Sequence, residues 1–172
     1  MNKFLDAISD KLLPLANKLA SNRYLSILRD AFMLAFPLTM FGSIVVVICN
    51  LPFLNDGTKA LLNDLLGSGK SATMSIITVF VTFGIGYYLS KSYDVEGIFG
   101  GAISFARFLI LTPFFTTSDG GEKVSSVLSL DRLGAKGMFF GMIVAFLSAE
   151  IYSRTSKKGW QIKMPDSVPP AV

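Results

Sequence analysis

The sequence contains no histidine and only one cysteine, Cys49, among its 172 residues. Without an imidazole the chain lacks the commonest general base, and it can neither offer histidine ligands to a metal nor carry a phosphohistidine. Cys49 stands in an apolar run with no base beside it, so we interpret it as an apolar filler rather than a nucleophile. The sequence therefore predicts no catalytic residue, no metal site and no cofactor, and it leaves open whether the chain forms part of an enzyme.

Charge is also scarce, since charged residues make up 16% of the chain and hydrophobic residues 51%. The longest uncharged run extends over 25 consecutive residues, from Ala31 to Asn55. A helix of about 20 mostly apolar residues crosses a bilayer core of about 30 Å, because it pairs its own N–H and C=O groups where lipid offers no partners. The run is too long for the core of a cleaved signal peptide. The chain is therefore predicted to lie in a membrane.

Three further apolar runs follow the first. Ser71 to Ser90 is uncharged, while Gly97 to Ser118 and Gly137 to Ser153 contain one charged residue each. The four runs together predict an all-α, polytopic membrane protein whose four transmembrane helices occupy residues 31–153.

The two flanking segments have a different composition. In residues 1–30, apolar side chains recur at roughly helical spacing, with Lys, Asp and Asn between them: Phe4, Leu5, Ile8, Leu12, Leu15 and Leu19. This pattern predicts an N-terminal amphipathic helix, bent at Pro14, that lies on the inner membrane interface. A helix packed on a cytoplasmic partner would show the same pattern. Residues 154–172 follow the fourth run and contain four basic residues.

The basic residues are distributed unevenly between the two predicted sides of the membrane. The termini and the second connection hold ten: Lys3, Lys11, Lys18, Arg23, Arg29, Lys91, Arg154, Lys157, Lys158 and Lys163. The other two connections hold five: Lys59, Lys70, Lys123, Arg132 and Lys136. By the positive-inside rule both termini are expected in the cytoplasm. Because this asymmetry accounts for the net charge of +4, no nucleic-acid partner is predicted.

A stripe of small residues marks the fourth run. Gly137, Gly141, Ala145 and Ala149 are spaced by four, so they lie on one face of a helix and let another helix approach closely. The third run has shorter pairs of the same kind, Gly97 with Gly101 and Ala102 with Ala106. We expect helix packing at these residues.

Arg107 lies near the middle of the third run, where a charge must face protein or water rather than lipid. Glu150 is the only acid within a run, but it lies near the cytoplasmic end of the fourth run and fits Arg154, one turn further on. Arg107 is thus either a ligand or counter-charge site, or a side chain that snorkels or pairs with a helix outside this chain.

The segment Gly67-Ser68-Gly69-Lys70-Ser71 has the end of a phosphate-loop pattern. Asp64 stands where that pattern requires its first glycine, and no strand precedes it. We therefore expect a polar outer loop before the second run.

Three segments resemble one known family. Asn22 to Asp30 (NRYLSILRD), followed by Phe36-Pro37 and Gly42-Ser43, is similar to the start of enzyme IIC, the membrane permease subunit of the bacterial sugar phosphotransferase system, in its lactose/cellobiose branch. Leu133 to Phe139 (LGAKGMF) resembles the segment that leads into the fourth span of that family, and Ile162 to Val172 (IKMPDSVPPAV) resembles the segment that joins its fourth and fifth spans. The resemblance therefore implies that residues 154–172 form a cytoplasmic linker toward a fifth span, in a protein of the bacterial inner membrane. Met1 to Asn22, with Pro14 and Asn17-Lys18-Leu19, looks more like the cellobiose or diacetylchitobiose type than the lactose type.

The resemblance implies the N-terminal, dimer-forming part of a permease for coupled uptake and phosphorylation of a β-linked disaccharide such as cellobiose, with the cytoplasmic enzymes IIA and IIB as partners. In the family the sugar site, with its histidine and glutamate, belongs mainly to the second half, so no substrate-binding residue carries over to a position here and the chain alone is expected to be inactive. Arg107 departs from the small or apolar residue that the family pattern implies. The alternatives are a small four-span transporter, for which the first run lacks a central acid, and a regulatory membrane subunit.

Overall fold

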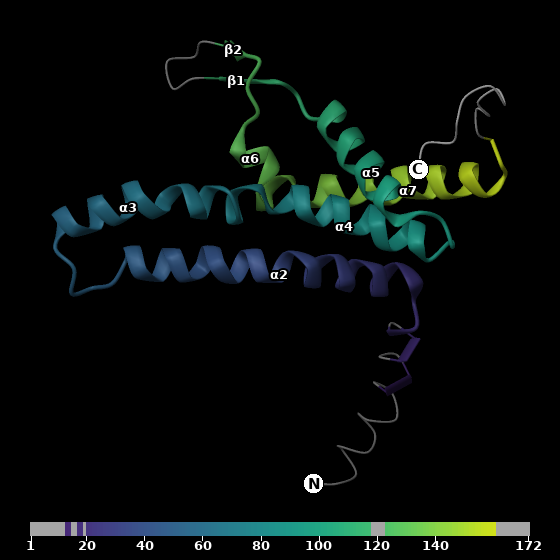
Figure 1. Cartoon of the computed structure of the whole chain (residues 1–172), viewed down its shortest axis with the longest axis horizontal. Coiled ribbons are helices and arrows are strands. Elements are labelled where there is room, and N and C mark those ends of the chain that lie inside the picture. Colours follow the sequence, from purple (N-terminus) through teal and green to yellow (C-terminus); the bar gives the residue numbers. More distant parts are fainter. Residues whose placement is uncertain (1–12, 15–16, 19, 118–122, 161–172) are drawn as a thin grey trace, which may run out of the picture.

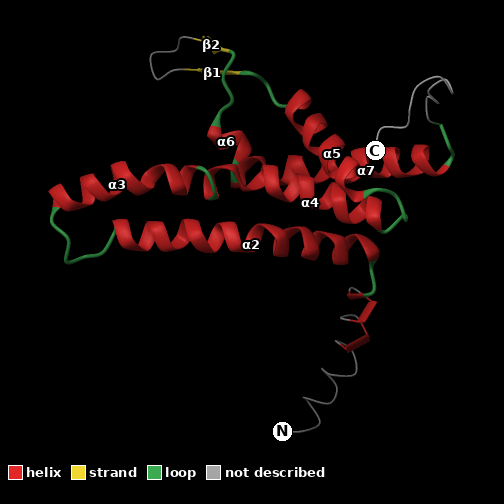
Figure 2. Cartoon of the chain, viewed as in Figure 1, coloured by secondary structure: helices red, strands yellow, loops and turns green. Residues whose placement is uncertain are grey.

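Helices packed along one another form the body of the chain in the computed structural model, which describes residues 13–14, 17–18, 20–117 and 123–160 (Figure 1). In chain order the elements are α2 (Arg23–Cys49), α3 (Asp56–Ser71), the 3₁₀ turn η1 (Met74–Ile76), α4 (Ile77–Lys91), α5 (Gly97–Leu111), β1 (Phe115–Thr117), β2 (Lys123–Ser125), α6 (Leu130–Leu133), the 3₁₀ turn η2 (Ala135–Gly137) and α7 (Met138–Lys157). The predicted all-α class is confirmed, because the two short strands are a small addition to the helices (Figure 2).

α2 begins eight residues before the apolar run that predicted it. The side-chain oxygen of Asn22 caps the helix by accepting hydrogen bonds from the backbone N–H groups of Tyr24 (3.0 Å) and Leu25 (3.4 Å). One face of α2 is buried against the other helices, and Met33, Phe36 and Val47 are among the large apolar side chains that remain more than half exposed. A helix apolar on both its buried and its exposed sides is suited to lipid.

α3 corrects the prediction of a polar outer loop. Residues 67–71 are the last turns of a 16-residue helix that lies beside α2 (Figure 1). Asn55 caps its start by accepting a hydrogen bond from the N–H of Thr58 at 2.8 Å. The helix continues through η1 into α4, so the second predicted span is the C-terminal part of a longer helical stretch, 56–91.

α5 is shorter than the apolar run that predicted it. The helix ends at Leu111, and Thr112 is extended (φ −87°, ψ 122°), because the residue before a proline is pushed out of the helical region. Beyond Pro113 the chain forms an antiparallel ladder in which Phe115 pairs with Ser125 and Thr117 with Lys123. The prediction of a helical span from Gly97 to Ser118 is therefore wrong at its C-terminal end.

The core lies where α2, α4 and α7 meet. Eight buried side chains form it: Ile27, Ala31, Ala35, Val81, Ile85, Leu89, Ala145 and Ala149. Three stretches of the described chain are long and apolar enough to cross a membrane, namely 23–49, 56–91 and 135–157, and α5 is a shorter apolar helix.

The predicted segment boundaries shift accordingly. α2 starts before residue 30 and α7 continues past residue 153, to Lys157. Residues 1–12, 15–16 and 19 of the expected amphipathic helix, and residues 161–172 of the expected linker, lie outside the described residues.

Candidate functional site

The N-terminus of α2, the C-termini of α4 and α7 and the N-terminus of α5 meet at one end of the bundle (Figure 1). This end also carries every tyrosine of the chain: Tyr24, Tyr87, Tyr88, Tyr93 and Tyr152. Tyrosine gathers at membrane–water interfaces because its ring is apolar and its hydroxyl polar. We call the polar group around Tyr93, made of Arg23, Ser92, Tyr93, Glu150, Arg154 and Lys157, the Tyr93 cluster.

Arg23 joins α2 to the α4–α5 loop. Its guanidinium donates from Nε (2.9 Å) and Nη2 (2.6 Å) to the hydroxyl oxygen of Ser92, and its Cζ lies 3.7 Å from the centroid of the Tyr93 ring. The Nζ of Lys157 lies 5.6 Å from the same centroid. Both distances are within the range of cation–π attraction.

Glu150 joins the same loop to α7. Its Oε1 accepts hydrogen bonds from the hydroxyl of Tyr93 (2.6 Å) and from Nε of Arg154 (2.8 Å), and the Arg154 pair confirms the prediction made from their spacing. The hydrogen bond to Glu150 raises the pKa of Tyr93, so the phenol stays protonated at neutral pH and remains a donor. Glu150 Oε2 is buried and has no hydrogen-bond partner within the described part of the chain.

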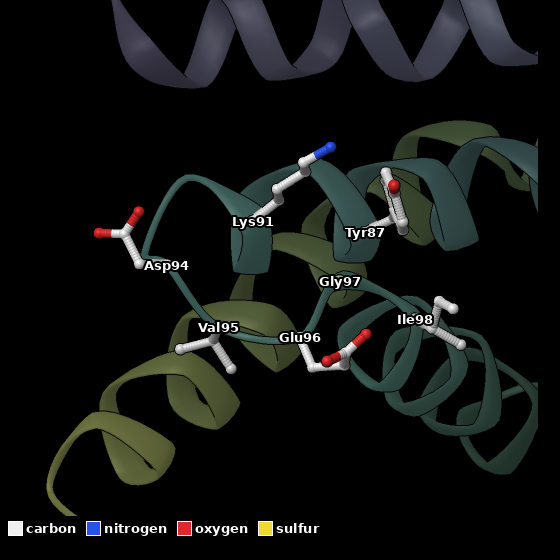
Figure 3. Close-up of a pocket in the computed structure, with 7 residues that line it drawn as sticks. All are labelled: Tyr87, Lys91, Asp94, Val95, Glu96, Gly97 and Ile98. Carbon is white, nitrogen blue, oxygen red and sulfur yellow. The ribbon is translucent and has the colours of Figure 1, made fainter.

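A pocket of about 530 Å³ opens beside this cluster, in the connection from α4 to α5 (Figure 3). Seven residues line it: Tyr87, Lys91, Asp94, Val95, Glu96, Gly97 and Ile98. The carboxylates of Asp94 and Glu96 point in different directions, and neither is aimed at the Lys91 amine (Figure 3). A sugar site needs several polar groups directed at one point, which this pocket does not supply.

The predicted small-residue stripe of α7 faces other helices of the same chain. A Cβ on Gly141 would lie 2.5 Å from Thr78 Cγ2 and 2.9 Å from Thr82 Cγ2, both on α4. Ala145 and Ala149 are fully buried, and Gly137 is half-buried in η2. The use of this stripe in association with a second copy stays a prediction.

A closer helix contact lies elsewhere, between α4 and α5. A Cβ on Gly100 would overlap the hydroxyl of Ser90 and lie 2.7 Å from the carbonyl oxygen of Gly86. The pattern of small residues had pointed instead to Gly97, Gly101, Ala102 and Ala106; the two glycines do face Tyr87 and Phe83 of α4, but the two alanines are exposed. The missed signal was Gly86 with Ser90, a small pair on α4 itself.

Arg107 lies in the last turns of α5 and is half-buried. The neighbouring Phe108 lies beside Gly141 of α7, with its Cε2 atom 3.5 Å from the Cβ position of that glycine. Glu150 follows Gly141 by more than two turns of α7, so it lies at a different depth from Arg107. This depth difference agrees with the expectation that Arg107 and Glu150 do not pair. Among the described residues, no ion pair or side-chain hydrogen bond involves Arg107, and no group of three or more Cys, Asp or Glu could hold a metal.

Comparison with known proteins gives consistent matches. The family model described as "Phosphotransferase system, EIIC" matches residues 29–172. The "PTS system oligo-beta-mannoside-specific EIIC component" of Bacillus subtilis is 58% identical, over 97% of this chain and 39% of that protein. The "PTS system cellobiose-specific EIIC component" of Geobacillus stearothermophilus is 36% identical, over 100% of this chain and 41% of that protein.

One similar crystal structure is that of the transporter ChbC, the IIC component from the N,N'-diacetylchitobiose-specific phosphotransferase system. It superposes with a TM-score of 0.81 at 34% identity, over 95% of this chain and 40% of that one. The chain thus spans about 40% of the length of the relatives it matches.

Proposed function

Because the chain belongs to the EIIC family of the phosphotransferase system, we propose that it supplies the N-terminal helical part of a sugar permease in the bacterial cytoplasmic membrane. The substrate class is a β-linked di- or oligosaccharide. The observation that carries this proposal is the 58% identity to an oligo-β-mannoside component, supported by the likeness to cellobiose and diacetylchitobiose components.

The part played by this chain is to scaffold the sugar site. Its described helices bury small and apolar side chains in their core. The buried polar side chains among them are serines and threonines, and hydroxyls such as those of Thr82 and Ser104 already donate to backbone carbonyls of the chain itself. A disaccharide loses many hydrogen bonds to water on entering a membrane protein, so its site must replace them. We assign that replacement to the part of the permease that follows the matched 40%, with enzymes IIA and IIB as the cytoplasmic phosphoryl donors.

An uptake experiment tests this assignment. The chain is expressed in cells that lack the oligo-β-mannoside component, alone or together with the remaining part of the Bacillus subtilis component, and uptake and phosphorylation of mannobiose and cellobiose are measured. The chain alone should give no uptake, because it offers no converging polar groups, and the two parts together should restore it. Either part alone is the matched control. Micromolar binding of cellobiose by the purified chain alone would show that the site lies in this part.

The proposed topology has four spans and both described ends of the chain in the cytoplasm. In support, the described basic residues of the termini belong to the helix ends that meet at the Tyr93 end of the bundle. Lys123 and Arg132 belong instead to β2 and α6, which lie between the C-terminus of α5 and the N-terminus of α7, away from that end (Figure 1). α5 has 15 residues, about 22 Å at a rise of 1.5 Å per residue, and we assign it as the third span because it packs along α4 and α7.

Reporter fusions test this topology. A reporter placed after Lys163 should be active on the cytoplasmic side, and one placed after Lys123 on the opposite side. A third fusion after Lys91 serves as a control and should match Lys163. The same side for Lys123 and Lys163 would contradict four spans.

A further inference from the structure

We propose that the Tyr93 cluster binds the phosphate headgroup of an anionic phospholipid through Arg23, Arg154 and Lys157. This binding surface is separate from the proposed sugar-transport function and does not depend on it. The observation behind it is that three cationic side chains from two helices, α2 and α7, gather around one tyrosine ring.

The charges of the cluster do not cancel. Glu150 is the one carboxylate within it, and Oε1 is engaged by Arg154 at 2.6 Å and 2.8 Å. Within the described ranges, neither Arg23 nor Lys157 makes an ion pair with a carboxylate. The cluster therefore carries two positive charges in excess, near one ring and within a Debye length of about 8 Å of it at physiological salt.

The arginines are already held in place. Ser92 and the Tyr93 ring fix the guanidinium of Arg23, and Glu150 fixes that of Arg154. Each guanidinium has five N–H donors, of which these contacts use only some, so donors remain for phosphate oxygens. Because the side chains are ordered before binding, little further rotamer entropy is lost when an anion arrives.

The surface next to the cluster fits a lipid better than a free phosphate. On α7, the exposed residues Arg154, Ile151 and Leu147 follow one another at spacings of three and four, so they lie on one face of the helix. The stripe continues toward the other end of the helix with Ile143 and Phe139, which are also exposed. A phospholipid whose phosphate is bound at Arg154 would place its acyl chains along this apolar stripe, whereas inorganic phosphate has no apolar part that could contact the stripe.

The position of the cluster suits the same ligand. Basic groups between helices at the cytoplasmic surface are typical sites for anionic lipid headgroups, and tyrosines mark the depth of the interface. Tyr24, next to Arg23, packs edge to face on Phe146 of α7 with ring centroids 5.8 Å apart, which keeps the start of α2 beside α7.

Native mass spectrometry of the 172-residue chain in an uncharged detergent tests the proposal, with phosphatidylglycerol and phosphatidylcholine of identical acyl chains as probes. Phosphatidylglycerol should bind in preference. Lys157→Gln should weaken its binding about fivefold and Arg23→Gln/Lys157→Gln roughly 25-fold, since each basic group near a membrane surface contributes about one such factor. Lys157→Arg should bind as the original chain does.

The control variant Lys59→Gln/Lys70→Gln removes two positive charges from α3 and should leave binding unchanged. Because the Lys157 side chain makes no hydrogen bond in the described structure, Lys157→Gln keeps the fold even if Arg23→Gln loosens it. Equal binding of both lipids, an unchanged affinity of Lys157→Gln and the double variant, or displacement of the lipid by millimolar inorganic phosphate would each overturn the proposal. If the chain shows no preference for phosphatidylglycerol but binds phosphorylated enzyme IIB, and Lys157→Gln weakens that binding, the cluster is a site for a protein partner instead.

Discussion

Replacing Gly100 by valine is expected to separate α5 from α4 and to lower the free energy of unfolding by roughly 3 kcal/mol, the upper part of the range for an overpacked core. The backbone of α5 passes so close to α4 at this point that a Cβ would overlap the Ser90 hydroxyl and approach the Gly86 carbonyl oxygen to 2.7 Å. The Ser90 hydroxyl could rotate away, but the Ser90 Cβ, at 2.5 Å, and the backbone carbonyl of Gly86 cannot.

Thermal unfolding of the purified chain in detergent, followed by circular dichroism, measures this effect. Gly67→Val is the matched control, because Gly67 lies on α3 with no atom within 4 Å of its Cβ position. It should leave the unfolding temperature unchanged or raise it slightly, since valine is a better helix former than glycine. If both variants unfold at the same temperature as the original chain, α5 does not pack on α4 as described.

The helices could be predicted from the sequence because lipid imposes a simple requirement. Any segment that crosses the bilayer must pair its own backbone groups, so long apolar runs become helices whatever their neighbours. That rule identified α2, α4, α5 and α7 but not their ends. Local chemistry sets the ends, and the cap at Asn22 and the proline at 113 were both visible in the sequence.

α3 was missed because its sequence is polar in composition. Its leucine pairs at 61–62 and 65–66 are spaced as a helix requires, but the glycines, serines and charged residues on either side of them favoured a loop. Packing along α2 supplies the stability that composition did not predict, as the approach of Gly69 to Phe41 shows. β1 was missed for the opposite reason, because Phe115–Thr117 lies at the end of the third apolar run, while β2 lies beyond that run.

The Tyr93 cluster could be predicted only in part. Glu150 and Arg154 are four residues apart on one helix, so their pairing followed from helical geometry alone. Arg23 and Ser92 are 69 residues apart, and Tyr93 and Glu150 are 57 apart. Such contacts depend on how whole helices pack, and one sequence carries no local signal for them.

The double replacement Gly141→Leu/Ala145→Leu is expected to prevent α7 from packing on α4 and α5, with a loss of most of the stability of the chain. Gly141 faces two threonine methyl groups on α4, and the carbonyl of Ala145 accepts a hydrogen bond from Ser104 on α5 at 3.4 Å. Each introduced leucine would push these helices apart, at about 1–3 kcal/mol per site.

The matched control for this double variant is Ala102→Leu/Ala106→Leu, which introduces the same two side chains at the same spacing on the exposed face of α5. Helicity and unfolding temperature should fall steeply for the α7 variant and stay near the original for the α5 variant. Cross-linking in detergent distinguishes packing within one chain from association of two. Because Ala145 is fully buried by its own chain, leucine there should disrupt the monomer itself, before any dimer forms. An α7 variant that keeps its unfolding temperature and loses only the cross-linked dimer would place the stripe against a second copy.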